Sequence, residues 1–196
     1  FEYKSQSSFQ AINQSTNLVE KQTLQLLLSE EAATQKQVYY EHCDRLMGVV
    51  YQYLRAVADA EEVLQDVFLT IFEKIDRFDP EKGSFQAWTH RIAVNAALMF
   101  LRKQKNMVFT QEDLTTLPTT EQLITQADQM EQSDLDYYID QLPEKSAVVF
   151  RLKAVEGYNH REIANMLCIK STASRAIYSR ARKTLRQYLS SVRILA

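Results

Sequence analysis

Apolar side chains recur at helical spacing through most of this chain, and the most regular run spans residues 60–75. Its apolar positions follow one another at alternating intervals of three residues and one residue, so each repeats after four: Ala60, Val63, Leu64, Val67, Phe68, Ile71, Phe72 and Ile75. This spacing is typical of an amphipathic helix with one buried side. Asp59, with Glu62 three positions later, has the spacing of a capping box, so we expect the helix to begin next to Asp59.

The opposite side of this predicted helix is acidic and carries one leucine. Its residues are Glu62, Gln65, Asp66, Leu69 and Glu73. A charged helix side is often simply exposed to solvent. An apolar residue among carboxylates also suits a basic partner helix with an apolar centre. Both interpretations stay open at this point.

A second helix is predicted over residues 84–103, capped by Ser84. Apolar residues at helical spacing, most of them large, indicate its core side: Phe85, Trp88, Ile92, Ala96 and Met99. Another side carries Arg91, Asn95 and Arg102. Cations fit phosphates and amides fit base edges, so that side is either a nucleic-acid surface or a solvated polar side.

The segment between these two helices, residues 76–84, contains Pro80 and Gly83 and is predicted to be a loop. Phe78 and Phe85 stand at its edges. Aromatic rings beside a helix that carries Arg91 and Asn95 are suited to receive an unstacked base. The same rings are equally suited to anchor the loop to the core.

Periodicity predicts further helices at both ends of the chain. Residues 18–28 and 33–54 are read as core-forming helices, and a helix begins at Leu142-Pro143-Glu144, with Gly157 after its end. Its expected core residues are Val148, Val149, Leu152 and Val155. Asn159 and Glu162 form a capping pair for the next short helix, and a tight connection at 168–170 leads to a helix over 171–189. The last helix is basic, so the pair is predicted to be a DNA-binding helix-turn-helix: Arg175, Arg180, Arg182, Lys183 and Arg186.

Composition supports an all-α protein, because 196 residues include only three Gly and three Pro. Cys43 and Cys168 are isolated, and the histidines His42, His90 and His160 are far apart in sequence. No metal-ligand spacing, nucleophile–histidine pairing or glycine-rich phosphate loop appears, so we expect no enzyme, no cofactor and no metal. No apolar run approaches membrane-spanning length and no signal peptide is evident, which predicts a cytoplasmic protein.

Charge divides the chain into three parts. The net charge is −2 over residues 1–106, −8 over residues 107–141, which contain no Lys or Arg, and +8 over residues 142–196. An acidic connector beside a basic module indicates two functional modules and a spacer. We therefore expect a flexible N-terminus at 1–17, a helical domain at 18–106, an acidic flexible linker at 107–133 and a second helical domain at 134–196.

Two ordered sets of motifs resemble the extracytoplasmic-function sigma factors of bacterial RNA polymerase, in the sigma-70 family. The segments 59–68, 83–88 and 91–95 are similar to the family's second conserved region. Four further segments are similar to the family's fourth conserved region: Leu142-Pro143-Glu144, Val155-Glu156-Gly157-Tyr158, Glu162-Ile163-Ala164 and Ser179-Arg180-Ala181-Arg182-Lys183. The resemblance covers roughly residues 20–105 and 135–190.

The resemblance implies two binding surfaces in the first domain. Core polymerase would be bound through the coiled coil of its largest subunit by Glu62, Gln65, Asp66, Leu69 and Glu73. The minus-ten promoter element would be melted, and an extruded base held, by Phe78, Lys82, Ser84, Phe85, Trp88, Arg91 and Asn95.

The same resemblance gives the rest of the chain a role. The linker would pass near the polymerase's active cleft and RNA exit path, and the flap region would be a further contact. The minus-thirty-five element would be read by Arg161, Ser171, Ser174, Arg175, Ile177, Ser179, Arg180, Arg182 and Lys183. An anti-sigma factor or a recruiting protein is a further expected partner.

The helix-turn-helix connection departs from the family pattern. The family usually has Leu-Gly-Ile-Ser and then Gly-Thr, whereas this chain has Leu167-Cys168-Ile169-Lys170 and then Thr172-Ala173. Lys170 cannot accept a hydrogen bond from a helix N-terminus, and Ile177 stands where a polar residue is common. We therefore hypothesise that reading of the minus-thirty-five element is relaxed and that a partner helps to recruit the chain.

Two alternatives remain from sequence. A stand-alone helix-turn-helix regulator would bind duplex DNA as a symmetric dimer, with the N-terminal half for dimerisation or sensing. A sigma-like adaptor would keep the acidic helix for polymerase but depend on another DNA- or RNA-guided protein for targeting, and would tolerate loss of Arg175 and Arg180.

Overall fold

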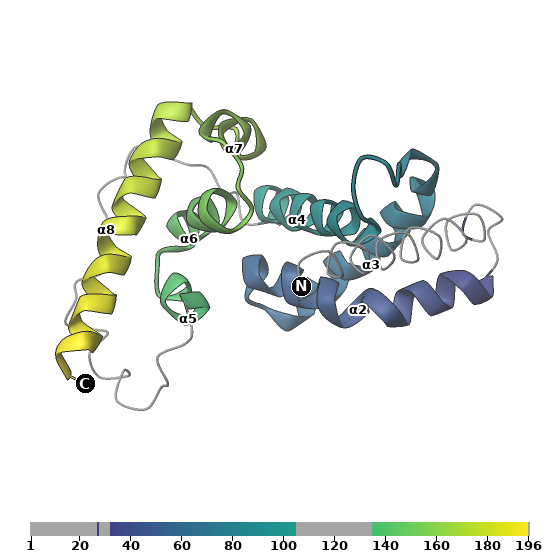
Figure 1. Ribbon diagram of the computed structural model, residues 1–196, viewed down its shortest axis with the longest axis horizontal. Coiled ribbons are helices and arrows are strands. Elements are labelled where there is room, and N and C mark those ends of the chain that lie inside the picture. Colours follow the sequence, from purple (N-terminus) through teal and green to yellow (C-terminus); the bar gives the residue numbers. More distant parts are fainter. Residues whose placement is uncertain (1–26, 28–31, 105–134, 196) are drawn as a thin grey trace, which may run out of the picture. The chain divides into compact units, whose positions relative to one another are not determined.

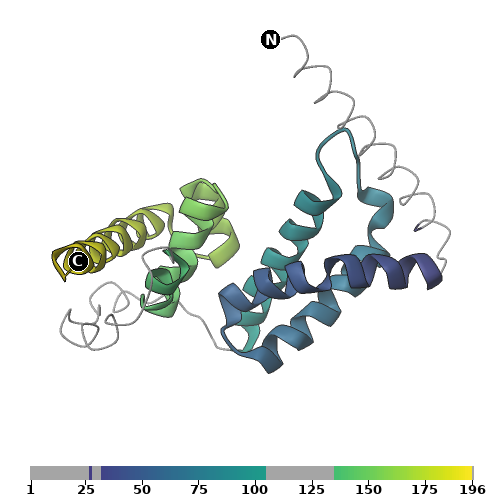
Figure 2. The same cartoon turned by 60° about the horizontal axis from the view of Figure 1, so that its bottom comes forward.

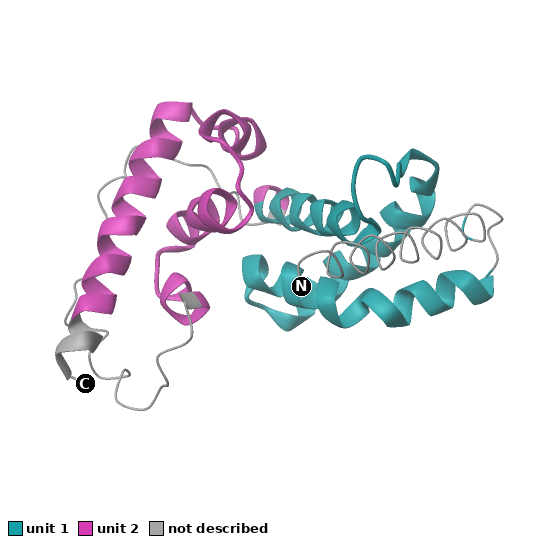
Figure 3. Ribbon diagram, in the orientation of Figure 1, with its two compact units in different colours: residues 1–101 teal, residues 102–196 magenta. Residues whose placement is uncertain are grey.

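The computed structural model describes residue 27 and residues 32–104 and 135–195. Every regular element in these ranges is a helix, in agreement with the predicted all-α class. The chain divides into two compact units, residues 1–101 and residues 102–196 (Figure 3). The expected N-terminal segment, most of the helix at 18–28 and the acidic linker lie outside the described residues.

Unit 1 is built from α2 (Ala32–Leu54), α3 (Val57–Glu73), the short 3₁₀ helix η1 (Ile75–Arg77) and α4 (Phe85–Gln104). α2 and α3 pack side by side in both views (Figures 1 and 2). The predicted helix at 33–54 is confirmed. Arg55, with a φ of 57°, takes the left-handed conformation that ends α2 and allows the chain to reverse at once into α3.

The predicted capping box at Asp59 is wrong. α3 begins two residues earlier, at Val57, and Ala56 stands at its N-cap without a side-chain hydrogen bond. Asp59 lies in the first turn instead, where its carboxylate faces the positive end of the helix dipole. The buried side of α3 is the predicted one, and Ile75 continues it in η1.

α4 turns a different side to the core from the one predicted. Ser84 caps it as expected, because its Oγ accepts a hydrogen bond from the Ala87 backbone N–H at 3.2 Å. Of the predicted core residues only Phe85 is buried, whereas Met99 is 67% exposed. The buried side consists of Phe85, Thr89, Ala93, Val94, Ala97, Leu98 and Leu101. Three of these residues, Thr89, Ala93 and Ala97, are small, and a prediction weighted toward large apolar side chains misses them.

Thr89 is completely buried yet fully bonded. Its hydroxyl lies 3.0 Å from the carbonyl of Phe85 and accepts a hydrogen bond of 2.8 Å from the guanidinium of Arg45. The first contact is within α4, and the second ties α4 to α2. A buried hydroxyl that keeps its partners costs little, so this polar contact holds α4 in register on the hairpin.

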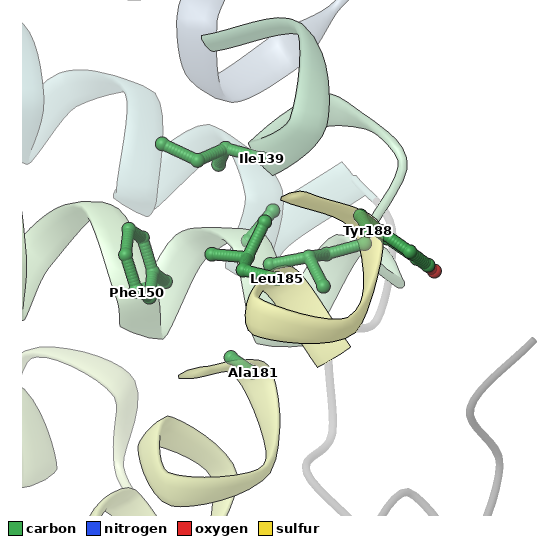
Figure 4. Close-up of a cluster of buried hydrophobic side chains, with 7 residues drawn as sticks. Ile139, Phe150, Ala181, Leu185 and Tyr188 are labelled. Atoms are coloured by element: carbon green, nitrogen blue, oxygen red, sulfur yellow. The ribbon is translucent and has the colours of Figure 1, made fainter. Parts of the chain in front are cut away.

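Unit 2 contains α5 (Leu135–Asp140), α6 (Glu144–Phe150), the π-helix η5 (Arg151–Val155), α7 (His160–Leu167) and α8 (Ser171–Leu195). Side chains from α5, α6, α8 and the turn between α5 and α6 meet in one apolar cluster, labelled in part in Figure 4: Ile139, Leu142, Ala147, Phe150, Ala181, Leu185 and Tyr188. α6 starts directly after Pro143, as predicted, and Gly157, with a φ of 78°, follows the end of η5.

The prediction that Val155 lies in the core is wrong. Val148, Val149 and Leu152 are buried as expected, but Val155 is 55% exposed. The reason is the π-helix, in which the Glu156 backbone N–H bonds to the Arg151 carbonyl at 3.0 Å, five residues back. The extra residue in this turn rotates Val155 out of the core side that a regular α-helix would give it.

Arg151 is the largest fully buried side chain of the described residues and is only 1% exposed. Its guanidinium donates to Asp136 at 2.5 Å and to Asp140 at 2.8 Å, both on α5. The side chains of Asp136 and Asp140 remain 53% and 42% exposed. Arg151 is therefore buried, whereas its two partners still contact solvent. These two charge-assisted bonds hold α5, which has only six residues, against the end of α6.

We expect Arg151→Ala to destabilise unit 2 by about 2 kcal/mol, because two charge-assisted hydrogen bonds and the packing of a buried side chain are lost. Urea unfolding of the full chain followed by circular dichroism measures the change, and hydrogen exchange of the α5 and α6 amides locates it. The control is Arg161→Ala on the exposed surface of α7, expected within about 0.5 kcal/mol of the unmodified chain. Equal midpoints for the two variants would contradict the assignment.

Candidate functional site

The acidic side of α3 faces solvent along its whole length. All five residues predicted for polymerase binding are exposed: Glu62, Gln65, Asp66, Leu69 and Glu73. Leu69 is 59% exposed and lies opposite the buried side of the helix. The structure thus presents an apolar centre surrounded by carboxylates, and we call these five residues the α3 face.

Two tyrosines of α2 are exposed, although the helix at 33–54 was predicted to be core-forming. Tyr39 is 39% exposed and its ring centroid is 4.6 Å from that of Phe68, while Tyr40 is 65% exposed. Helical spacing could not separate them from core positions, because Tyr39 follows the buried Val38 directly.

The loop between η1 and α4 forms a pocket of about 220 Å³. It is lined by Arg77, Phe78, Asp79, Lys82, Gly83, Ser84, Ala87, Trp88 and Arg91. Five of the seven residues predicted to bind the minus-ten element are among them. The structure therefore brings together loop residues and the first two turns of α4 around one small cavity, which we call the loop pocket.

Three aromatic rings close the inner end of this loop. The centroid of Phe78 lies 5.5 Å from those of Phe85 and Trp88, and the Phe85 and Trp88 centroids are 5.8 Å apart. Phe78 and Phe85 are only 7% and 8% exposed, so they anchor the loop to the core. Phe85 was expected to contact a base directly. Its ring is instead covered by its own unit and does not line the pocket.

The rim of the loop pocket carries a defined ion pair. One oxygen of Asp79 accepts the Lys82 ammonium at 2.8 Å and the other accepts the Glu81 backbone N–H at 3.0 Å. The bond from Lys82, and then that from Glu81, lowers the pKa of Asp79, while Asp79 raises the pKa of Lys82. Both groups are therefore charged at neutral pH.

Arg91 and Asn95 are exposed one turn apart on α4. Arg91 lines the loop pocket and Asn95 does not. The pair continues the polar surface outward from the pocket, and Arg102 is exposed two turns further on. A strand of nucleic acid that left the pocket along α4 would meet a cation and then an amide.

The helix-turn-helix has the predicted start. The Asn159 side chain accepts the backbone N–H groups of Arg161 and Glu162 at 2.9 and 3.0 Å, and the Glu162 carboxylate accepts the Asn159 N–H at 2.6 Å. α7 ends at Cys168, which takes the left-handed conformation with a φ of 55°. This is the position where the resembled family usually has Gly.

A polar contact joins the first turns of α7 and α8. His160 Nδ1 lies 2.9 Å from the hydroxyl of Ser174, and the His160 and Tyr178 rings meet edge to face at 5.7 Å. Burial, and then the charges of Lys153 and Arg175, lower the pKa of His160, which favours the neutral ring at pH 7. Neither histidine spacing nor helical periodicity pointed to this contact.

Two residues that were predicted to read the minus-thirty-five element are buried. Ser174 is 0% exposed and bonded to His160, and Ile177 is 4% exposed in the core. Side chains covered by their own unit cannot contact DNA. Of the remaining set, Ser171 and Arg180 are half-buried, and the exposed members are Arg161, Arg175, Ser179, Arg182 and Lys183. The exposed surface is thus mainly cationic.

No group of three or more His, Cys, Asp or Glu side chains in the described ranges is arranged to hold a metal ion. Within the same ranges, no helix has both the length and the apolar character needed to cross a membrane.

Comparison with known proteins agrees with the resemblance. Residues 38–107 match the model of sigma-70 region 2, and residues 132–185 match that of sigma-70 region 4. The ECF RNA polymerase sigma factor SigE of Mycolicibacterium smegmatis is 29% identical over 76% of this chain and 59% of SigE, so this chain spans less than two thirds of that relative. RpoE of Cereibacter sphaeroides is 28% identical over 79% of this chain and 85% of RpoE.

A solved structure of RpoE with the anti-sigma factor NepR from Bartonella quintana is 19% identical and aligns with a TM-score of 0.46, over 79% of this chain and 96% of that chain. The two region models in order, with several ECF relatives, define the class: the chain belongs to the sigma-70 family, as a sigma factor of the extracytoplasmic-function (ECF) group. Sigma factors are not a class of enzyme. They bind core RNA polymerase and promoter DNA.

We expect Cys168→Gly to stabilise unit 2 by about 0.5–1 kcal/mol, because glycine takes the left-handed conformation without a clash at Cβ. Thermal unfolding of the full chain measures the gain. Cys168→Ala is the matched control, since it removes the thiol and keeps Cβ, and it should give no gain. An equal rise in both variants would show that the thiol, and not the backbone conformation, is the cause.

Proposed function

We propose that this chain binds core RNA polymerase through the α3 face and opens promoter DNA around the loop pocket, without catalysing a reaction itself and within the cytoplasm. The helical domain predicted at 18–106 would carry both tasks, and the domain predicted at 134–196 would contact DNA upstream. The observation that carries the proposal is that the region 2 match holds an exposed acidic helix with an apolar centre and a base-sized pocket beside exposed Arg91 and Asn95.

The α3 face favours a basic partner with an apolar ridge. Burying Leu69 would contribute about 1.5–3 kcal/mol, which is the usual gain for a leucine side chain. Glu62, Asp66 and Glu73 surround it and would steer a cationic helix into register. The coiled coil of the polymerase's largest subunit is the partner that we propose.

Promoter opening requires help from the polymerase. Extruding one base costs a few kcal/mol, and stacking on a ring such as Trp88 returns about 1–3 kcal/mol. Phosphate contacts from Arg91 add to this, but the balance for the isolated chain stays near zero. The proposal therefore includes weak binding of duplex DNA by the chain alone and opening only in complex with core polymerase.

The surface of α8 supports relaxed reading of the minus-thirty-five element. With Ser174 and Ile177 buried, the exposed residues are mostly Arg and Lys, which bind phosphates irrespective of sequence. Ser179 and Arg175 remain suited to base edges. Strong upstream protection with sharp sequence preference from residues 171–186 alone would contradict this part of the proposal.

The stand-alone regulator is not favoured. It accounts for α7 and α8, whereas residues 38–107 also match sigma-70 region 2.

Asp66→Lys combined with Leu69→Ala should weaken binding to core polymerase by about 100-fold, because the variant removes the apolar centre and reverses a charge that faces a basic partner. Co-elution and titration with purified core polymerase measure the effect. The control is Glu61→Lys, which is exposed on α3 outside the predicted set and should retain binding. Unchanged affinity of the double variant would remove the docking assignment.

Asn95→Ala should lower open-complex formation by about tenfold and leave polymerase binding intact, since one amide contact to an unpaired base is lost. Permanganate reactivity of the promoter measures opening. A template with a premelted bubble should restore transcription, and Gln86→Ala on an exposed turn of α4 should behave like the unmodified chain. Normal opening by Asn95→Ala would count against the role of this side chain.

A further inference from the structure

A groove of about 400 Å³ runs along α8 of unit 2, beside Phe150 of α6. Its floor is apolar and consists of Phe150, Tyr178, Leu185 and Leu189. Phe150 and Leu185 also belong to the buried cluster of unit 2, whereas Leu189 is 43% exposed. The groove, which we call the α8 groove, therefore presents an exposed leucine on a packed apolar floor.

Two exposed arginines, Arg182 and Arg186, line the α8 groove one turn apart. The guanidinium of Arg182 lies 5.8 Å from the centroid of the Tyr178 ring, and that ring stacks on Phe150. This cation–π contact holds Arg182 at the groove. Within the described ranges, neither guanidinium forms a salt bridge with a carboxylate. The groove thus offers two cations beside an apolar surface.

On the α3 face, the carboxylates have a fixed spacing from the exposed leucine. Asp66 precedes Leu69 by three residues, and Glu62 precedes it by seven. At the rise of an α-helix, these separations are about 4.5 and 10.5 Å along the axis. Positions at this spacing share one side of a helix, and all three side chains are exposed.

The α8 groove has the same spacing with the opposite charge. Arg186 precedes Leu189 by three residues, and Arg182 precedes it by seven. If α3 and α8 run parallel with leucine against leucine, each of the two carboxylates is level with one arginine. Contact in this register would bury two exposed leucines and pair two charges of each sign.

The two surfaces suit each other, and neither suits a copy of itself. Two α3 faces would bring carboxylates together and two α8 grooves would bring arginines together, and like charges across an interface cost free energy. The partner that fits both surfaces is therefore a second copy of this chain, arranged head to tail. Such a contact is heterologous, so it leaves one α3 face and one α8 groove free at the ends of the assembly.

We propose that the α3 face of one copy of this chain docks in the α8 groove of a second copy. Leu69 lies against Leu189, and the carboxylates before Leu69 lie opposite the groove arginines. One helix in one groove buries less area than a stable dimer needs, so the association is weak, with a Kd of about 10–100 μM. The α3 face is also the surface proposed for polymerase, so a copy docked through it cannot bind polymerase there.

Sedimentation velocity of the full chain, without polymerase, measures the association over a series of concentrations. The unmodified chain should gain mass as its concentration rises and lose it in high salt, because exposed charge pairs are screened. Two variants reverse the charges: Glu62→Arg with Asp66→Arg on α3, and Arg182→Glu with Arg186→Glu in the groove. Each should weaken the association at least about tenfold, since like charges then face each other.

The decisive variant carries all four substitutions. Its charges are exchanged and again complementary, so its association should return to near that of the unmodified chain. The matched control is Arg175→Glu with Lys183→Glu, which makes the same change in charge at exposed positions of α8 that do not line the groove. The control should associate normally, and circular dichroism checks the helical fold of every variant.

A mass that stays at one chain at every concentration would overturn the inference. Association that persists in both charge-reversed variants would overturn it too, because a different surface would then be responsible. A folded variant with all four substitutions that remains monomeric would do the same, because the charges would not pair in this register. Polymerase binding is measured separately with core polymerase, so failure of self-association leaves the proposed function standing.

Discussion

The hydrogen bond between Thr89 of α4 and Arg45 of α2 is the contact on which unit 1 depends. Thr89, Ala93 and Ala97 are completely buried on the core side of α4. The hydroxyl of Thr89 is bonded both within α4 and to Arg45 of α2, which fixes the helix in position. The loop before α4 is anchored by the buried rings of Phe78 and Phe85, which lie in contact at its inner end. The exposed residues of α3 and α4 belong to the same compact unit.

Much of this architecture could be predicted from sequence, and the failures have physical causes. The α3 face follows from periodicity, because the apolar positions on the opposite, buried side of α3 are regularly spaced. The predicted buried side of α4 is wrong, because three of the seven residues on its actual buried side, Thr89, Ala93 and Ala97, are small and carry little weight in a pattern of large apolar residues. Ile177 and Ser174 were assigned to DNA by position in a motif, and only the packing of α8 shows that they are covered. A motif specifies a register along a helix, but burial depends on which neighbours pack against it.

The pocket shows a different limit of sequence reasoning. The sequence indicates a loop with aromatic edges, but it does not say that Phe85 is buried while Trp88 stays half-exposed at the wall. Asp79 has no distinct signal in the sequence, because one acid in a loop with several charges is common. The ion pair with Lys82 and the bond from Glu81 become visible only in three dimensions. Residues that position others leave weak sequence signals, as Arg151 also illustrates in unit 2.

The π-helix at Arg151–Val155 affects how the chain would respond to the deletion of a single residue. A π turn holds one more residue than the α turn it replaces, so removing one residue there would preserve helical hydrogen bonding. A deletion in a regular α-helix would instead rotate everything that follows by about 100° about the helix axis. At the π turn, Arg151 would remain paired to α5 and the chain would still approach α7 from a similar direction. A single-residue deletion should therefore be better tolerated in this segment than in a regular part of α6 or α8.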